Sequence, residues 1–198
     1  RDLISVLGGQ FEEGHPLMAV HPTPIPETRP DLWMLGSSDQ SAQMAGIFGT
    51  PFSFAHFITD DQGPQIMAMY RKMFEPSEVA SAPEGNIGIF VICAETDEEA
   101  ERRASSRNLW RTRLDTGKIG PVPTVEEALA YEYTPMEADR RDYNARRNII
   151  GNPETVKRKL LQTLDQYGVN EAVVVTITHS HEARLNSYKL LAKEFDLS

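Results

Sequence analysis

The sequence contains a single cysteine, Cys93, among its 198 residues. One cysteine excludes an intramolecular disulfide framework and fits a reducing cytoplasm. Cys93 lies within an apolar run, so we interpret it as a small buried side chain, with a reactive thiol as the less favoured alternative.

Long apolar runs and an excess of positive charge are also missing. No run approaches the ~20 apolar residues that cross a bilayer, and the first residues do not resemble a secretory signal. The net charge is −9 and the isoelectric point is about 5.1. We therefore expect a soluble, cytoplasmic protein whose partners are neither nucleic acids nor membranes.

Familiar ligand motifs are absent as well. Neither the GK[ST] of a Walker loop nor the G-x-G-x-x-G of a dinucleotide site occurs. His179, His181 and Glu182 form H-x-H-E, which lacks a strong metal-ligand spacing. We expect capping or solvent exposure there, and no metal site.

Apolar runs alternate with segments of helical periodicity along most of the chain. Strands are expected at 32–35, 52–58, 85–94 and 171–178, and helices at 39–48, 60–74, 153–167 and 179–195, with a further helix starting after Thr96. This order predicts a parallel α/β fold, and four strands make half of a (β/α)8 TIM barrel. A whole barrel takes about 250 residues, so we expect the C-terminal part of a longer protein, with an open α/β sheet as the alternative.

The connection after the third expected strand is enlarged. Residues 97–148 are polar and charged, and two or three helices are predicted there with a Gly/Pro break at 117–123. Five arginines recur along its first helix: Arg102, Arg103, Arg107, Arg111 and Arg113. A solvated basic face is the simplest interpretation, and an anion site is the alternative.

A turn with three hydroxyls follows the first expected strand. Gly36 is followed by Ser37 and Ser38, and Ser41 lies in the first turn of the next helix. Unpaired N–H groups at a helix N-terminus bind phosphate, although the carboxylate of Asp39 would repel it. The spacing alone leaves two interpretations open, a phosphate site or a plain cap with Ser38 as N-cap.

His56 is the other candidate for chemistry. It comes near the carboxyl end of the expected strand 52–58, where catalytic groups of barrels collect. Its phenylalanine neighbours equally favour a hydrogen-bonded packing role, so His56 is only a weak catalytic candidate.

Several segments together resemble the bacterial luciferase-like, flavin-dependent monooxygenase family. They are LWMLGSSDQSAQMAGIFGTPFSFAHFI (32–58), YRKMFEPS (70–77), VICAETDEEAERRA (91–104), IIGNPETVKRKL (149–160) and HEARLNSYKLLA (181–192). They recur in matching order over nearly the whole chain. The resemblance implies strands five to eight of a (β/α)8 barrel, usually dimeric, with residues 1–198 in one domain and an enlarged helical insertion at about 97–148.

The resemblance also implies a cofactor and a site for it. The family uses reduced FMN, or in some branches a deazaflavin, and it places the flavin phosphate on the loop formed here by Gly36, Ser37, Ser38 and Ser41. The implied activity is a flavin-dependent monooxygenase that acts with molecular oxygen on a small organic substrate and is supplied by an NAD(P)H-flavin reductase. The family's catalytic histidine lies in the N-terminal half, so no general base is transferred to this chain, and the insertion is a candidate lid.

Two other functions stay open at this point. One is a flavin-binding or structural barrel remnant without turnover, and the other is a phosphosugar-type barrel enzyme.

Overall fold

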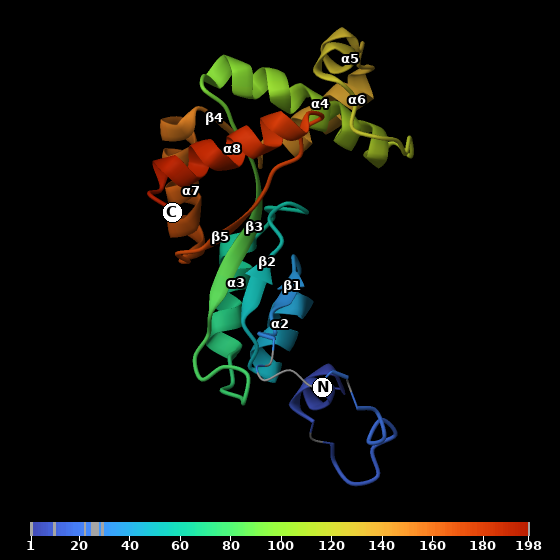
Figure 1. Cartoon of the computed structure of the whole chain (residues 1–198), viewed down its shortest axis with the longest axis vertical. Helices are drawn as coiled ribbons and strands as arrows, with labels where there is room; N and C mark the ends of the chain where they lie inside the picture. Colours follow the sequence, from blue (N-terminus) through green and yellow to red (C-terminus); the bar gives the residue numbers. More distant parts are fainter. Residues whose placement is uncertain (1, 10, 22, 25–27, 29, 198) are drawn as a thin grey trace.

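The computed structural model describes residues 2–9, 11–21, 23–24, 28 and 30–197. Within these ranges the chain forms one parallel sheet, in which β1, β2, β3 and β4 follow in order and β5 also pairs with β3. Figure 1 shows the strands running along the length of the molecule. Their bounds are β1 Met34–Gly36, β2 Phe52–Phe54, β3 Gly85–Cys93, β4 Ile149–Gly151 and β5 Ala172–Val175.

Helices connect the strands, as a parallel sheet requires. They are α1 Asp2–Gly8, α2 Asp39–Phe48, α3 Gly63–Met73, α4 Asp97–Asp115, α5 Val125–Ala130, α6 Pro135–Ala145, α7 Pro153–Tyr167 and α8 His181–Glu194. None of the helices in the described ranges is long and apolar enough to cross a membrane.

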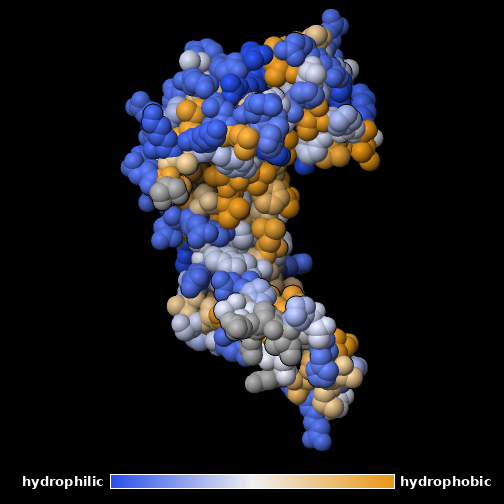
Figure 2. Space-filling model, in the orientation of Figure 1, coloured by the Kyte–Doolittle hydropathy of each residue, from blue (hydrophilic) through white to orange (hydrophobic). Residues whose placement is uncertain are grey.

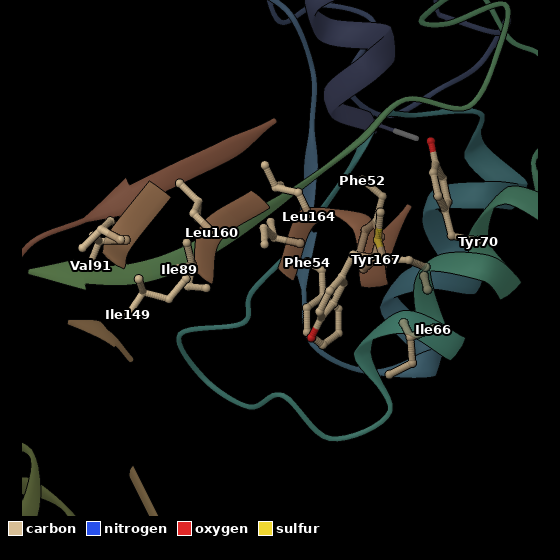
Figure 3. Close-up of a cluster of buried hydrophobic side chains, with 14 of the residues drawn as sticks. Phe52, Phe54, Ile66, Tyr70, Ile89, Val91, Ile149, Leu160, Leu164 and Tyr167 are labelled. Atoms are coloured by element: carbon tan, nitrogen blue, oxygen red, sulfur yellow. The ribbon is translucent and has the colours of Figure 1, made fainter. Parts of the chain in front are cut away.

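The main core lies between the sheet and the helices α2, α3, α7 and α8. Phe52 and Phe54 from β2 and Ile89 from β3 meet Tyr70 of α3 and Tyr167 of α7 there, all of them buried. Figure 3 shows these side chains gathered on one side of the strands, where the rings of Phe54 and Tyr167 lie 5.4 Å apart between centroids. This burial fixes which face of each strand points to the helices.

The opposite face of the sheet is largely uncovered, and we call it the open face. Because side chains alternate along a strand, Leu35, Phe90 and Val173 point away from the main core. Leu35 is 58% exposed and Val173 48% exposed. In Figure 2 a hydrophobic area crosses the middle of the molecule, where Figure 1 places the sheet.

Among the described residues, α4 covers the far end of the open face. The nine residues of β3 pair with β2 and β5 near its start and with β4 near its end. There α4 packs across the sheet, with Ala100 and Ala104 against Ile92 and Ile150. Figure 1 shows α4, α5 and α6 together at one end of the molecule.

The prediction of four strands is wrong in number, because β4 is a fifth. Three residues are too few to show a period, and the strand exists because Ile149 to Gly151 pair with the end of β3. The expected strands at 52–58 and 171–178 are shorter in the structure, since their last residues leave the sheet. The predicted helices 39–48 and 153–167 are confirmed, and the insertion holds three helices around the expected break.

The secondary structure predicted for the first 30 residues agrees less well with the structure. The sequence of residues 1–9 predicts the end of a helix, and α1 occupies most of it, its first residue lying outside the described ones. The prolines at 14–30 predict an extended connection. The described part of 14–21 instead folds into turns, with the N–H of Met18 bonded to the carbonyl of His15. Residues 22, 25–27 and 29 of that connection are outside the described ranges.

Candidate functional site

The turn between β1 and α2 is built as a reciprocal helix cap. Ser38 is the N-cap, and its hydroxyl accepts the N–H of Ser41 while the Ser41 hydroxyl accepts the N–H of Ser38, both at 3.2 Å. The Ser41 hydroxyl also donates to the carbonyl of Ser38 at 2.7 Å. The capping interpretation is therefore confirmed for Ser38, and two of the three hydroxyls serve the helix itself.

Gly36 has a packing role that the sequence did not reveal. A Cβ on Gly36 would overlap the Cβ and Oγ of Ser41, so the glycine lets the first turn of α2 sit directly on the end of β1. A glycine ahead of a helix N-terminus predicts close approach of a ligand to the backbone. In the structure Ser41 fills that space instead.

The donors left for a phosphate lie at the start of this turn. Ser37 is half-buried and makes no hydrogen bond with the described residues, whereas the N–H of Gln40 is already taken by the Asp39 carboxylate at 2.8 Å. The serine hydroxyls and the N-terminal end of α2 suit a phosphate group. No lysine or arginine occurs at 33–43, so a neutralising cation has to come from elsewhere.

The backbone beside His56 contacts this turn, since the N–H of Ala55 donates to the carbonyl of Gly36 at 2.8 Å, but the side chain of His56 points elsewhere. Its ring is 6% exposed and sits edge-on to Tyr167, with 5.7 Å between ring centroids. Its Nδ1 has no hydrogen-bond partner among the described residues. Burial lowers the pKa of His56, Asp60 opposes that effect, and Arg147 adds to it.

The surroundings of His56 form a separate surface cavity on the helix-covered side. Asp60, Arg147 and Tyr167 line it with His56, and none of the residues of the Gly36 turn does. The two predicted site elements are thus neighbours in the sheet, but their side chains line different surfaces. His56 packs in the wall between β2 and α7.

An apolar wall on the open face is the part of the site that sequence reasoning missed. Phe57 lies against Gly88, where a Cβ would come within 2.9 Å of its ring. The rings of Phe57 and Phe90 are 6.0 Å apart, and Phe90 pairs with Val175 in register. The ends of parallel strands meet at one edge, so this wall belongs to the same edge as the Ser37 turn. In the sequence, the alternation of Gly88 and Phe90 within β3 could have indicated this wall.

The remaining polar candidates are occupied elsewhere. His179 Nδ1 lies 3.0 Å from the carbonyl of Val122, and Ser180 caps α8. No group of three or more His, Cys, Asp or Glu side chains in the described ranges could hold a metal ion. Cys93 is buried, as predicted, and burial raises the pKa of its thiol to about 11.

The basic face expected on α4 is only partly solvated, because Arg102 is exposed while Arg103, Arg111 and Arg113 are half-buried. Arg102 and Arg103 pair with Glu99, and Arg113 pairs with Glu127. Arg107, in contrast, is 1% exposed, so the solvated interpretation is wrong for that residue. Helical periodicity places it on the same face as Ala100 and Ala104, which pack against the sheet.

Comparison with known proteins identifies the family. The luciferase-like monooxygenase family model matches residues 7–171, which is most of the chain. The chain belongs to the luciferase-like monooxygenase family. The earlier resemblance is thereby confirmed.

Individual relatives support this assignment. The uncharacterized protein YceB of Bacillus subtilis is 38% identical over 195 residues, covering 98% of this chain and 59% of YceB. The crystal structure of apo-MsnO8 superposes with a TM-score of 0.82 at 33% identity, over 94% of this chain and 56% of MsnO8. This luciferase-like chain thus spans little more than half the length of the curated relatives it matches.

A more distant structure shares the fold. The oxygenating constituent of 3,6-diketocamphane monooxygenase from Pseudomonas putida, solved with FMN, gives a TM-score of 0.54 at 19% identity, over 93% of this chain and 54% of that one. The likeness extends to the parallel α/β architecture.

Proposed function

We propose that this luciferase-like protein is a flavin-dependent monooxygenase that binds reduced FMN with its phosphate on the turn at Gly36, Ser37, Ser38 and Ser41. The observation that carries the proposal is the hydroxyl-rich N-terminus of α2 at the strand-end edge of a luciferase-like sheet. The FMN complex of the distant structural relative supports a flavin rather than another phosphate ligand. A deazaflavin is the less favoured cofactor.

We further propose that this chain supplies strands five to eight of a (β/α)8 barrel, namely β1, β2, β3 and β5, with β4 as an additional short strand. The exposed apolar side chains of Leu35 and Val173 call for a cover, and the relatives are longer than this chain. In this arrangement residues 1–198 belong to one domain, and the other half packs on the open face. The helices α4 to α6 form the insertion at about 97–148 and cover the end of the site as a lid.

The residues of this chain have positioning and shielding roles. Ser37 and the N–H of Asp39, whose neighbours Gln40 and Ser41 already donate within the turn, hold the phosphate. Phe57 and Phe90 form a dry wall beside the flavin. FMN, when bound, supplies the reaction with oxygen. His56 remains a weak catalytic candidate, since its ring packs on Tyr167.

The partners follow from the same proposal. A small organic substrate binds on the apolar open face, an NAD(P)H-flavin reductase supplies the reduced FMN, and the protein is a homodimer. We place the enzyme in the cytoplasm, consistent with its single cysteine.

FMN binding by the full natural protein tests the phosphate site. In the variant Ser37→Asp a carboxylate faces the phosphate, so we expect FMN affinity, measured by quenching of flavin fluorescence, to fall at least about tenfold, or ~1.4 kcal/mol. Ser81→Asp is the matched control, because Ser81 is exposed on the connection that precedes β3, at the opposite edge of the sheet.

The outcomes separate the competing functions. Equal FMN affinity of both variants would place the phosphate elsewhere. Tight FMN binding without oxygen consumption, in the presence of a flavin reductase and candidate substrates, would favour the non-catalytic remnant. Absence of flavin binding by the full protein would refute the proposal.

A further inference from the structure

Arg107 on α4 is a buried cation without a partner. Its side chain is 1% exposed, and Nε, Nη1 and Nη2 all lack a hydrogen-bond acceptor among the described residues. The guanidinium carbon lies 4.1 Å from the centroid of the Phe90 ring. Arg107 therefore sits on the wall of the open face with five N–H donors unused.

The other charges around Arg107 do not neutralise it. Arg111 and Arg147 are close enough to lower the pKa of Arg107, after the larger effect of burial. The acid nearby is Asp115, which already pairs with Arg111 and Arg140 at 3.0 Å each. The net charge around Arg107 is therefore positive.

Arg147 is also incompletely paired, although Asp60 lines the same cavity on the helix-covered side. It is 4% exposed, one of its Nη atoms donates to Asn144 at 2.8 Å, and its Nε has no acceptor among the described residues. Asn144 itself donates to Asp115 at 2.8 Å. The single carboxylate of Asp115 thus serves two arginines and an amide.

Such an arrangement is costly unless something anionic completes it. A buried charge without a partner loses most of its hydration, and the face of one aromatic ring makes up only part of that loss. A small cavity of about 10 Å³ adjoins the guanidinium, lined by Phe90, Asn148 and Val175 among others. That volume is close to the room needed by one water-sized particle.

We infer that Arg107 binds a small anion at this cavity, on top of the Phe90 ring. The bound group is a compact anion. It is either a free ion such as a halide or formate, or the terminal carboxylate of a ligand that lies on the open face. The site requires no flavin, so it goes beyond the proposed function, and its test does not depend on flavin binding. Phe90 and Val175 offer no hydrogen-bonding groups, and the Oδ1 of Asn148, unpaired among the described residues, also borders the cavity, so the occupant is a small group held mainly by Arg107.

Thermal unfolding of the full natural protein tests the site. Chloride, formate, acetate and butyrate are titrated at constant ionic strength against gluconate, which is too large for the cavity. A ligand at about ten times its Kd should raise Tm by about 2–4 °C. Arg107→Met should abolish the rise, whereas Arg102→Met, at an exposed arginine of the same helix, should retain it.

A direct measurement makes the test independent of the variants' stability. Chloride-35 NMR of the wild-type protein should show line broadening that formate reverses. Stronger stabilisation by chloride and formate identifies a free anion as the occupant, and stronger stabilisation by butyrate identifies the carboxylate end of a ligand. Equal responses in all three proteins, or no anion dependence and no broadening, would overturn the inference, since water or a carboxylate elsewhere in the protein would then satisfy Arg107.

Discussion

Gly36 and Ser41 share one volume of space, in which the side chain of Ser41 occupies the position that a Cβ of Gly36 would take. The contact seats the first turn of α2 on the end of β1. It also places the reciprocal cap formed by Ser38 and Ser41 at the edge of the sheet. The geometry of the candidate phosphate turn therefore depends on a missing side chain.

Substitution Gly36→Ala should strain this turn. The added methyl group has to displace Ser41, and we expect the free energy of unfolding to fall by about 1–3 kcal/mol, as for overpacked cores. Urea unfolding measures the loss. Gly120→Ala is the matched control, because a Cβ there meets no atom within 4 Å. Equal stability of the two variants would contradict the steric role of Gly36.

Asp97 should link the insertion to the last part of the sheet. Its carboxylate accepts the N–H of Asn152 at 2.7 Å and the Thr155 hydroxyl at 3.4 Å, so it joins the N-termini of α4 and α7. We expect Asp97→Ala to destabilise the protein by about 1–2 kcal/mol. Glu98→Ala, at an exposed position of the same turn, should cost less than about 0.5 kcal/mol in the same urea measurement. The link is absent if the two losses match.

Because of Glu137, the stability of the insertion should decrease at acid pH. The N–H of Thr134, then Lys118, the hydroxyl of Thr134 and Tyr131, lower the pKa of Glu137 to about 2 from an unfolded value of 4.5. Its contribution is fully present above about pH 4.5 and is lost as the pH falls toward 2, because the unfolded chain takes up the proton first.

The variant Glu137→Gln isolates that contribution. We expect it to lose stability at pH 6 and to show a shallower fall than the wild type between about pH 4.5 and 2, as followed by urea unfolding at each pH. Glu132→Gln provides an exposed control in the same segment. Parallel pH curves for the wild type and Glu137→Gln would exclude this role.

His56 should act on stability in the neutral range. Burial lowers its pKa in the folded protein below 6.5, so the unfolded chain binds a proton that the native ring does not. The free energy of unfolding should therefore decrease as the pH falls from about 7 to 5, by at most ~1.4 kcal/mol per pH unit.

Replacement by phenylalanine tests this assignment. His56→Phe should flatten the pH dependence, while His181→Phe, at an exposed position, should leave it unchanged. If the His56 ring only packs on Tyr167, the turnover of His56→Phe should stay within about threefold of the wild type once flavin is bound. A loss of more than about a hundredfold would instead assign His56 a catalytic role.

The elements with strong local signals could be predicted from the sequence. Ser38 followed by Gly49 marks the start and end of α2, and Asn152, Pro153 and Gly168 do the same for α7, because caps and helix breakers act within one turn. β4 could not be found in this way. Its three residues become a strand only through their pairing with Val91 to Cys93, almost 60 residues earlier.

The parts of the site differ in the same respect. The serines of the turn are neighbours in the chain, so their proximity and capping chemistry could be predicted. Which way His56 points, and which of five arginines on α4 is buried, could not. Those outcomes depend on Tyr167 and Phe90, which come from other elements.

The sequence by itself determined the alternation of strands and helices, the capped turn after β1 and the family, because these rest on local patterns and ordered motifs. The tertiary structure alone decided that Ser41 fills the space beside Gly36, that His56 joins the wall at α7, and that Arg107 lies unpaired on Phe90. The physical reason is that burial and charge pairing depend on residues distant along the chain, whose approach no local pattern encodes.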